Sequence, residues 1–161
     1  MKLAIYPGTF DPITNGHLDL VERGLRIFDE MIIAVAPNPK KQALFSVEER
    51  LSMIRESVKS CRNVRVESFS GLLVDYVKSR GGAAIVRGLR AVSDFEYELQ
   101  MALMNRRLDT NIETVFMMPS EEFSFLTSTM VKEVASFGGS VKGLVPEIVL
   151  NELNNKFKAL S

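Results

Sequence analysis

Short apolar runs alternate along this chain with longer segments whose apolar residues recur at helical spacing. The apolar runs are rich in Val, Ile, Ala and Phe, and they lie at residues 2–6, 31–36, 64–69, 83–87 and 114–118. Near-continuous apolar runs of this length are typical of parallel strands covered on both faces. The pattern therefore predicts a five-stranded parallel sheet.

The segments between these runs have the pattern of amphipathic helices with recognisable ends. Ser46-Val47-Glu48-Glu49 is a capping box before the second helix, and residues 93–96 repeat this signature before a long fourth helix. Thr127 or Ser128 begins a fifth, and Pro146 suits the first turn of a last helix. With no composition break and no internal repeat, we expect an α/β fold: one doubly wound domain over residues 1–161, with helices on both faces.

Composition narrows the classes of partner. Of 161 residues 46% are hydrophobic, and twenty basic residues balance twenty acidic ones, so no global field attracts nucleic acid or an acidic membrane. Cys61 is the only cysteine, which excludes an internal disulfide and fits a reducing compartment. No apolar run approaches the length of a membrane span or a signal peptide. We expect a soluble, cytoplasmic protein that binds neither nucleic acid nor membranes.

The most informative segment is the loop that follows the first strand. It contains Thr14-Asn15-Gly16-His17, in which a hydroxyl, a glycine and the only histidine open a helix. A helix start after a strand offers free N–H groups and the positive end of the helix dipole to an anion. The sequence thus indicates a phosphate site with a built-in hydrogen-bond donor. The alternative is an ordinary helix cap with a surface histidine.

Polar residues also follow the other strands, at the edge where a doubly wound sheet binds ligands. Arg87-Gly88-Leu89-Arg90 places two guanidinium groups around a glycine, which suits bidentate phosphate contacts, or else simple solvation. Residues 123–129 crowd hydroxyls at a helix start, and Lys132 follows one turn later. These groups fit a phosphate cradle, although a helix cap needs only one of the hydroxyls.

Several familiar chemistries are missing from the sequence. It contains no phosphate-binding loop of the Gly-x-x-x-x-Gly-Lys-Ser/Thr type, and no G-x-G-x-x-G follows the first strand. One histidine and one cysteine make no plausible zinc site, and there is no G-x-S-x-G nucleophile motif. What remains is phosphate chemistry that works by positioning and charge.

Four segments in this order and spacing resemble the bacterial phosphopantetheine adenylyltransferases, and the resemblance runs over essentially the whole chain. They are residues 8–12, residues 14–17, Arg87–Arg90 running on to Glu98, and residues 123–129 followed by Lys132. The T-x-G-H element alone is shared by a wider nucleotidyltransferase superfamily. Many members have Trp where this chain has Phe123, and relatives often have Arg where it has Lys132. The resemblance implies a Rossmann-like nucleotidyltransferase fold.

The resemblance also implies a reaction and a set of residue roles. ATP and 4′-phosphopantetheine would give dephospho-CoA and pyrophosphate, the penultimate step of coenzyme A biosynthesis, with His17 as the catalytic residue. Mg²⁺ would accompany ATP, with no protein ligand that we name. The acceptor site would comprise Thr9, Lys41, Leu73 and Arg87. The ATP site would comprise Thr9, Phe10, His17, Gly88, Leu89, Arg90, Glu98, Phe123, Ser124, Phe125, Leu126, Thr127, Ser128 and Thr129, with Lys132 as a further phosphate contact.

Two other functions stay open from the residues: a transferase of this fold with another phosphorylated acceptor, and a nucleotide sensor without turnover. By resemblance we expect a homohexamer, built as a dimer of trimers, and inhibition by coenzyme A. The predicted fourth helix, residues 93–108, carries apolar side chains on more than one face. A helix that covers one side of a sheet needs a single apolar stripe, so the second face predicts contact with another subunit.

Overall fold

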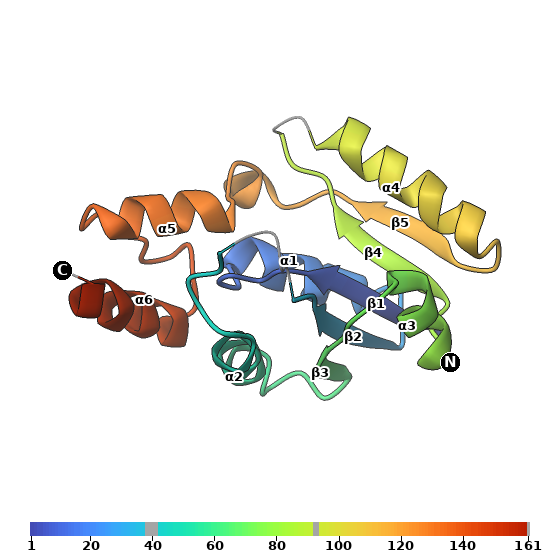
Figure 1. Cartoon of the computed structure of the whole chain (residues 1–161), viewed down its shortest axis with the longest axis horizontal. Coiled ribbons are helices and arrows are strands. Elements are labelled where there is room, and N and C mark those ends of the chain that lie inside the picture. Colours follow the sequence, from blue (N-terminus) through green and yellow to red (C-terminus); the bar gives the residue numbers. More distant parts are fainter. Residues whose placement is uncertain (38–41, 92–93, 161) are drawn as a thin grey trace.

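The computed structural model describes residues 1–37, 42–91 and 94–160, and it contains the five predicted strands in one parallel sheet. The strand order is β3-β2-β1-β4-β5, so the chain proceeds outward from β1 first in one direction and then in the other. The order reverses between β1 and β4 (Figure 1). The strands are β1 (Leu3–Gly8), β2 (Glu30–Val35), β3 (Val64–Ser68), β4 (Ala84–Gly88) and β5 (Glu113–Met117).

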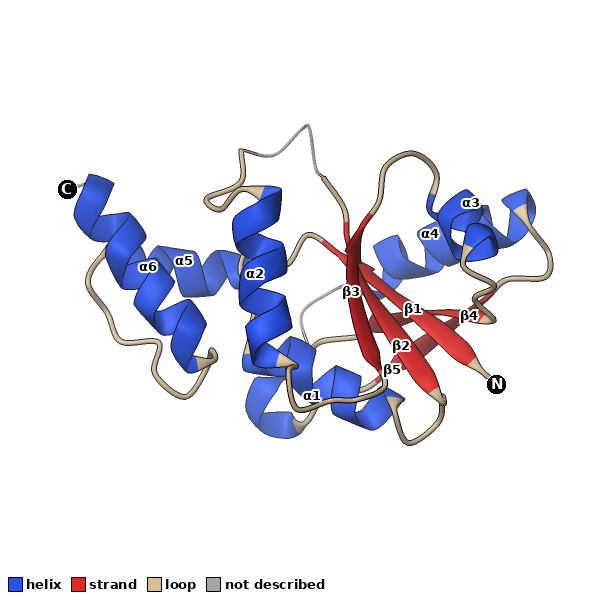
Figure 2. Ribbon diagram, turned by 90° about the horizontal axis from the view of Figure 1, so that it is seen from below, coloured by secondary structure: helices blue, strands red, loops and turns tan. Residues whose placement is uncertain are grey.

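Helices cover both faces of the sheet, as predicted (Figure 2). Side chains of α1 and α2 share one apolar cluster with alternate residues of β1 and β2, whereas α3 packs on the opposite face. The last two helices, α5 and α6, lie at one end of the molecule (Figure 1). The helices are α1 (Asn15–Gly24), α2 (Val47–Ser57), α3 (Leu73–Ser79), α4 (Phe95–Leu108), α5 (Ser128–Ser136) and α6 (Glu147–Leu160), with a short 3₁₀ turn at Glu121–Phe123.

Burial explains why the central strands have almost no polar residues. Ala4 and Ile5 of β1 are fully buried although they face opposite sides of the sheet, and Met31–Val35 of β2 are buried throughout. The edge strand β3 instead alternates, with Arg65 exposed between two half-buried valines. A strand covered on both faces needs a continuous apolar run, whereas an edge strand does not.

The helix starts follow the predicted capping signals with one correction. Ser46 and Glu49 form the predicted reciprocal capping box of α2, and the Thr127 side chain caps α5 by accepting from the Met130 N–H. The predicted cap of α4 is wrong by one residue. The cap position is Asp94, whose side chain makes no capping hydrogen bond, because its carboxylate binds Arg90 instead. Ser93 lies outside the described residues.

No helix within the described part of the chain is long and apolar enough to cross a membrane.

Candidate active site

A cleft of about 610 Å³ opens at the carboxyl edge of the sheet, beside the point where the strand order reverses. Its walls come from the loops after β1, β4 and β5, from the starts of α1 and α5, and from Gln42 and Ala43 before α2. Thirteen of the predicted site residues line it: Thr9, Phe10, His17, Arg87, Gly88, Arg90, Glu98, Phe123, Leu126, Thr127, Ser128, Thr129 and Lys132.

Five predicted residues are not among those that line this cleft. Leu73 begins α3 and packs against the apolar cluster on the other face of the sheet. Leu89 pairs its backbone with Met117, the Ser124 hydroxyl donates to the Glu121 carbonyl, and Phe125 is half exposed. Lys41 lies outside the described residues. The binding roles given to these residues, and to those that line the cleft, stay predictions.

His17 belongs to an unusual capping box at the start of α1. The Thr14 hydroxyl accepts from the His17 backbone N–H, and the backbone N–H of Thr14 donates to His17 Nδ1 at 2.9 Å. Glu or Gln commonly occupies this position and plays the same part. Because Nδ1 accepts a hydrogen bond, the neutral ring carries its proton on Nε2. The cap therefore selects one tautomer and leaves the Nε2–H for a ligand.

The surroundings of the imidazole keep it neutral. Burial, with added repulsion from Arg90 and then Arg87, lowers the pKa of His17 to about 3. The ring packs edge-on against Phe10, with centroids 5.0 Å apart, and lies 6.3 Å from the Tyr6 ring. At neutral pH His17 is thus a fixed, uncharged donor.

The backbone beside this corner is shaped by Phe10. Its φ is +48°, in the left-handed region that non-glycine residues rarely adopt, and its side chain is buried under the cleft. The ring covers Gly8, where a Cβ would lie 3.0 Å from the Phe10 ring atoms. Phe10 is therefore buried and also lines the cleft.

Arg87 is held firmly on the opposite wall. Its Nε and Nη2 donate to the two carboxylate oxygens of Glu98 at 2.8 and 2.6 Å, and its Nη1 donates to the Pro7 carbonyl at 2.7 Å. Burial opposes the charge on Arg87, but the bond to Glu98 outweighs it and raises the pKa of the guanidinium. Glu98 itself is buried. Its carboxylate orients Arg87, and the sequence interpretation did not identify this pair.

Two further cations line the cleft among the described residues, and both have carboxylate partners. Arg90 binds Asp94 one helical turn later through two hydrogen bonds of 2.7 and 3.0 Å. Lys132 of α5 donates to Asp11 at 2.8 Å. Burial opposes ionisation of Asp11, but Lys132 and two backbone N–H groups stabilise its charge, so the pKa of Asp11 is lowered.

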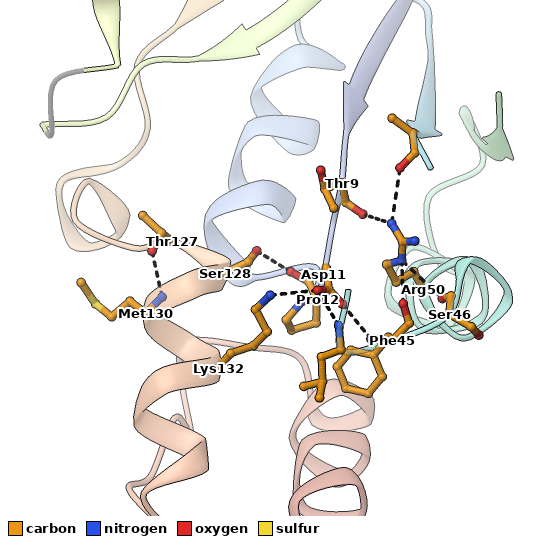
Figure 3. A network of polar contacts seen from close by, with 12 residues as sticks. Thr9, Asp11, Pro12, Phe45, Ser46, Arg50, Thr127, Ser128, Met130 and Lys132 are labelled. Carbon is orange, nitrogen blue, oxygen red and sulfur yellow. Dashed lines mark hydrogen bonds and ion pairs between the residues drawn. The ribbon is translucent and has the colours of Figure 1, made fainter. Parts of the chain in front are cut away.

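Figure 3 shows the contacts of Asp11, Ser128 and Arg50 around the loop after β1. Asp11 accepts from the backbone of Leu44 and Phe45, while the Ser128 hydroxyl donates to the Pro12 carbonyl at 2.7 Å. On the far side the buried guanidinium of Arg50 donates to the carbonyl of Thr9 at 2.8 Å. Three segments distant in sequence therefore meet around the loop after β1.

A separate contact fixes the loop after β5. The Asp19 carboxylate of α1 accepts from both the backbone and the hydroxyl of Ser120, at 2.9 and 2.7 Å, and Arg23 donates to both residues. These bonds hold the segment that leads into the 3₁₀ turn against α1. Asp19, Ser120 and Arg23 were not predicted to matter.

One of the residues that the sequence analysis did not identify, Arg50, could have been recognised from the sequence. Arg50 lies on the apolar face of α2 with Leu51 and Ile54, where a solvated arginine is out of place. A charge on such a face indicates a buried partner. Asp11 gave no comparable signal, because its partners are two backbone groups and a lysine distant in sequence. Asp19 and Arg23 have the i,i+4 spacing of an ordinary helix-surface pair, which does not indicate their contact with Ser120.

Comparison with known proteins agrees with this geometry. The model of the cytidylyltransferase-like family matches residues 5–134. The phosphopantetheine adenylyltransferase of Thermodesulfovibrio yellowstonii is 61% identical over 98% of both chains, and that of Clostridium kluyveri is 59% identical over 98% of this chain and 96% of its own. That of Syntrophus aciditrophicus is 54% identical over 99% and 97%. The chain therefore belongs to the cytidylyltransferase-like family and, within it, to the phosphopantetheine adenylyltransferases.

Proposed function

We propose that this enzyme transfers the adenylyl group of ATP to 4′-phosphopantetheine by direct in-line attack, giving dephospho-CoA and pyrophosphate. The observation that carries the proposal is the neutral His17 donor, fixed at a helix start that faces the same cleft as Arg87, Arg90 and Lys132. Relatives of 54–61% identity are named for this activity.

The reaction needs positioning and charge more than acid–base chemistry. An oxygen of the acceptor phosphate is already a nucleophile at neutral pH; it forms a bond to the α-phosphorus of ATP while the bond to the pyrophosphate oxygen breaks. No proton has to be removed from the acceptor. The His17 Nε2–H donates to the α-phosphate, where negative charge grows in the transition state. A neutral donor performs this task without changing its protonation.

The two sides of the cleft divide the substrates. Arg87, together with Lys41, binds the phosphate of 4′-phosphopantetheine, and Leu73 lines the pantetheine arm. Arg90 and the first turn of α5 bind the triphosphate, since hydroxyls and free N–H groups gather at Thr127–Thr129. Thr9 lies between the two phosphates. The fixed orientation of Arg87 supports this division. Glu98 and the Pro7 carbonyl hold its guanidinium group in place, so the group is already oriented for a phosphate.

Mg²⁺ would accompany ATP. The cleft carboxylates Asp11, Asp94 and Glu98 are each bonded to a lysine or arginine, and no cluster of three potential ligands occurs among the residues described. The donor set thus fits an ion held by phosphate oxygens and water, as Mg²⁺ prefers. Bound in this way, Mg²⁺ neutralises phosphate charge.

One assay tests the function. Purified protein is incubated with Mg²⁺ and ATP, and pyrophosphate is measured with and without 4′-phosphopantetheine, then with nicotinamide mononucleotide and glycerol phosphate as acceptors. The proposal requires release that depends on 4′-phosphopantetheine. Preference for another acceptor would identify a different transferase of this fold. Saturable ATP binding without release would identify a nucleotide sensor.

We also propose a homohexamer, a dimer of trimers, with α4 at a subunit contact. Within α4 only Glu98 and Asn105 are buried, and its apolar side chains are largely exposed: Phe95, Tyr97, Leu99, Met101, Leu103, Met104 and Leu108. A solvated helix with this face indicates a partner surface. Sedimentation should give six times the 18.0 kDa chain mass, and a monomer would contradict the assembly.

Coenzyme A combines the pantetheine and adenylate parts of the product, so we propose that it inhibits by occupying the same cleft. Addition of coenzyme A should raise the apparent KM for 4′-phosphopantetheine. A cytoplasmic location fits ATP as substrate and the single cysteine.

A further inference from the structure

The Asp11 carboxylate stands at the junction of three segments that line the cleft (Figure 3). Its Oδ1 accepts from the Phe45 N–H at 2.9 Å, and its Oδ2 accepts from the Leu44 N–H at 3.0 Å and from Lys132 Nζ at 2.8 Å. The residue is only 3% exposed. One side chain thus ties the loop after β1 to the segment before α2 and to α5.

Arg50 supports the same junction from the other side. Its Nε donates to the carbonyl of Phe45 at 3.1 Å, and its Nη1 donates to the carbonyl of Thr9 at 2.8 Å. Phe45 is therefore bonded through its N–H to Asp11 and through its carbonyl to Arg50. The two neighbours of Phe10 are thus bonded to this region: the carbonyl of Thr9 to Arg50 of α2, and the side chain of Asp11 to the segment before α2.

Both joined segments continue directly into the walls of the cleft. Gln42 and Ala43 precede the two backbone donors, and Thr127–Thr129 precede Lys132 by about one turn. Buried ion pairs are commonly replaced by packed apolar residues without loss of stability. We therefore attribute the buried Asp11 carboxylate, with its three hydrogen-bond donors, to the placement of the two cleft walls rather than to the stability of the fold.

We propose that Asp11 is a positioning residue, which sets the separation of the acceptor-side wall at Gln42–Ala43 from the first turn of α5. In-line transfer requires the two substrates at a fixed distance, and a shift of about 1 Å lowers such rates by about a hundredfold. Asp11 acts through Lys132 and the backbone of residues 44–45, and it touches neither substrate. The kinetic part of this inference rests on the proposed function.

The test is Asp11→Asn, which keeps the volume of the side chain but replaces one acceptor oxygen with an NH₂ group that opposes the donors. We expect kcat to fall at least about tenfold while both KM values change less than about threefold, because the binding groups remain but are misaligned. Lys132→Met should lower kcat in the same way, and Lys132→Arg should restore most of it. The double variant should be no slower than the slower single one.

Hydrogen exchange supplies a readout independent of turnover. In Asp11→Asn the amides of Leu44 and Phe45 should exchange faster, because they lose their acceptor, while the strand amides of β1 and β4 stay protected. Asp109→Asn is the matched control. Its carboxylate also accepts a backbone N–H and pairs with a lysine, Lys78, but it lies before β5, at the opposite edge of the sheet.

The outcomes are separable. Wild-type protein without acceptor-dependent pyrophosphate release refutes the proposed function, and the exchange measurement still decides whether Asp11 fixes the wall. Unchanged exchange at Leu44 and Phe45, or kcat within about threefold of an active wild type, overturns the inference. A rise in the KM for ATP at unchanged kcat in Lys132→Met would make Lys132 a direct phosphate ligand and would also overturn it.

Discussion

Two parts of the cleft differ in how they hold charge: the corner between β1 and α1, and the arginines Arg87 and Arg90 that face it. In the corner, the Thr14 backbone fixes a neutral His17, whose pKa is too low for it to gain a charge at neutral pH. Across the cleft, Arg87 and Arg90 keep their charges and are each bonded to a carboxylate. The corner is complete without a ligand, whereas under the proposed function the two arginines either share their carboxylates with a substrate phosphate or exchange them.

This difference follows from the tasks that phosphate transfer sets. A donor to the α-phosphate must be in place as charge develops, so a rigid, neutral group loses nothing to reorganisation. Binding two highly charged substrates instead requires cations, and unpartnered cations in one cleft would repel each other. The carboxylates hold the cations in the free enzyme and lower this repulsion.

The largest expected effect comes from the corner. His17→Ala should lower kcat by about 10²–10³-fold, because a donor to developing charge is lost. His17→Gln is the control, since Gln keeps the capping box with Thr14 and hence the helix start. We expect Gln to preserve stability and ATP affinity but to recover little of kcat, measured by steady-state kinetics and calorimetry. An alanine variant within tenfold of wild type would remove His17 from the mechanism.

The next effect concerns the cation that is held most firmly. Arg87→Ala should weaken 4′-phosphopantetheine binding by about 10–150-fold, the equivalent of about 1.5–3 kcal/mol for a charge-assisted contact. ATP affinity should change far less. Glu98→Gln keeps Arg87 but weakens the hydrogen bonds that orient its guanidinium group. We therefore expect a smaller loss of affinity for 4′-phosphopantetheine than in Arg87→Ala. Calorimetric titration showing equal losses for both substrates would contradict the division of the cleft.

The sequence predicted the corner far better than the charge pairs. Thr14 and His17 are three residues apart, so their contact follows from helix geometry, and the strands followed from continuous apolar runs. Arg87 and Glu98 are eleven residues apart, and Asp11 and Lys132 are 121 apart. Such pairs depend on how the helices pack against the sheet, and local sequence patterns do not determine this packing.

The neutral state of His17 also predicts a pH dependence of stability. The ordinary pKa of histidine is about 6.5, and the folded value is about 3. Below pH 6.5 His17 therefore binds a proton in the unfolded chain but not in the folded chain. The free energy of unfolding falls as the pH falls towards 3. Between about pH 7 and pH 5.5 this loss amounts to about 1.3 kcal/mol.

Urea unfolding of wild type and His17→Gln at these two pH values isolates that effect. The carboxylates with lowered pKa values, among them Asp11, are ionised in both folded proteins over this range, so they contribute equally. Wild type should lose about 1.3 kcal/mol more than the variant on acidification. Equal losses would mean that the ring is freely protonated in the folded enzyme.

The smallest effect tests whether the paired cations exchange partners. Asp94→Asn removes the carboxylate that binds Arg90 but leaves the guanidinium in the cleft. This pair is partly exposed, and such pairs contribute about 0.2–1 kcal/mol. If Arg90 leaves Asp94 to bind the triphosphate, the variant should bind ATP about 1.5- to 5-fold more tightly. The gain should vanish in Asp94→Asn/Arg90→Ala, as calorimetry with ATP would show. Weaker ATP binding by the single variant would instead mean that Asp94 holds Arg90 in its binding position, as Glu98 holds Arg87, and that the cations share their carboxylates with the substrate.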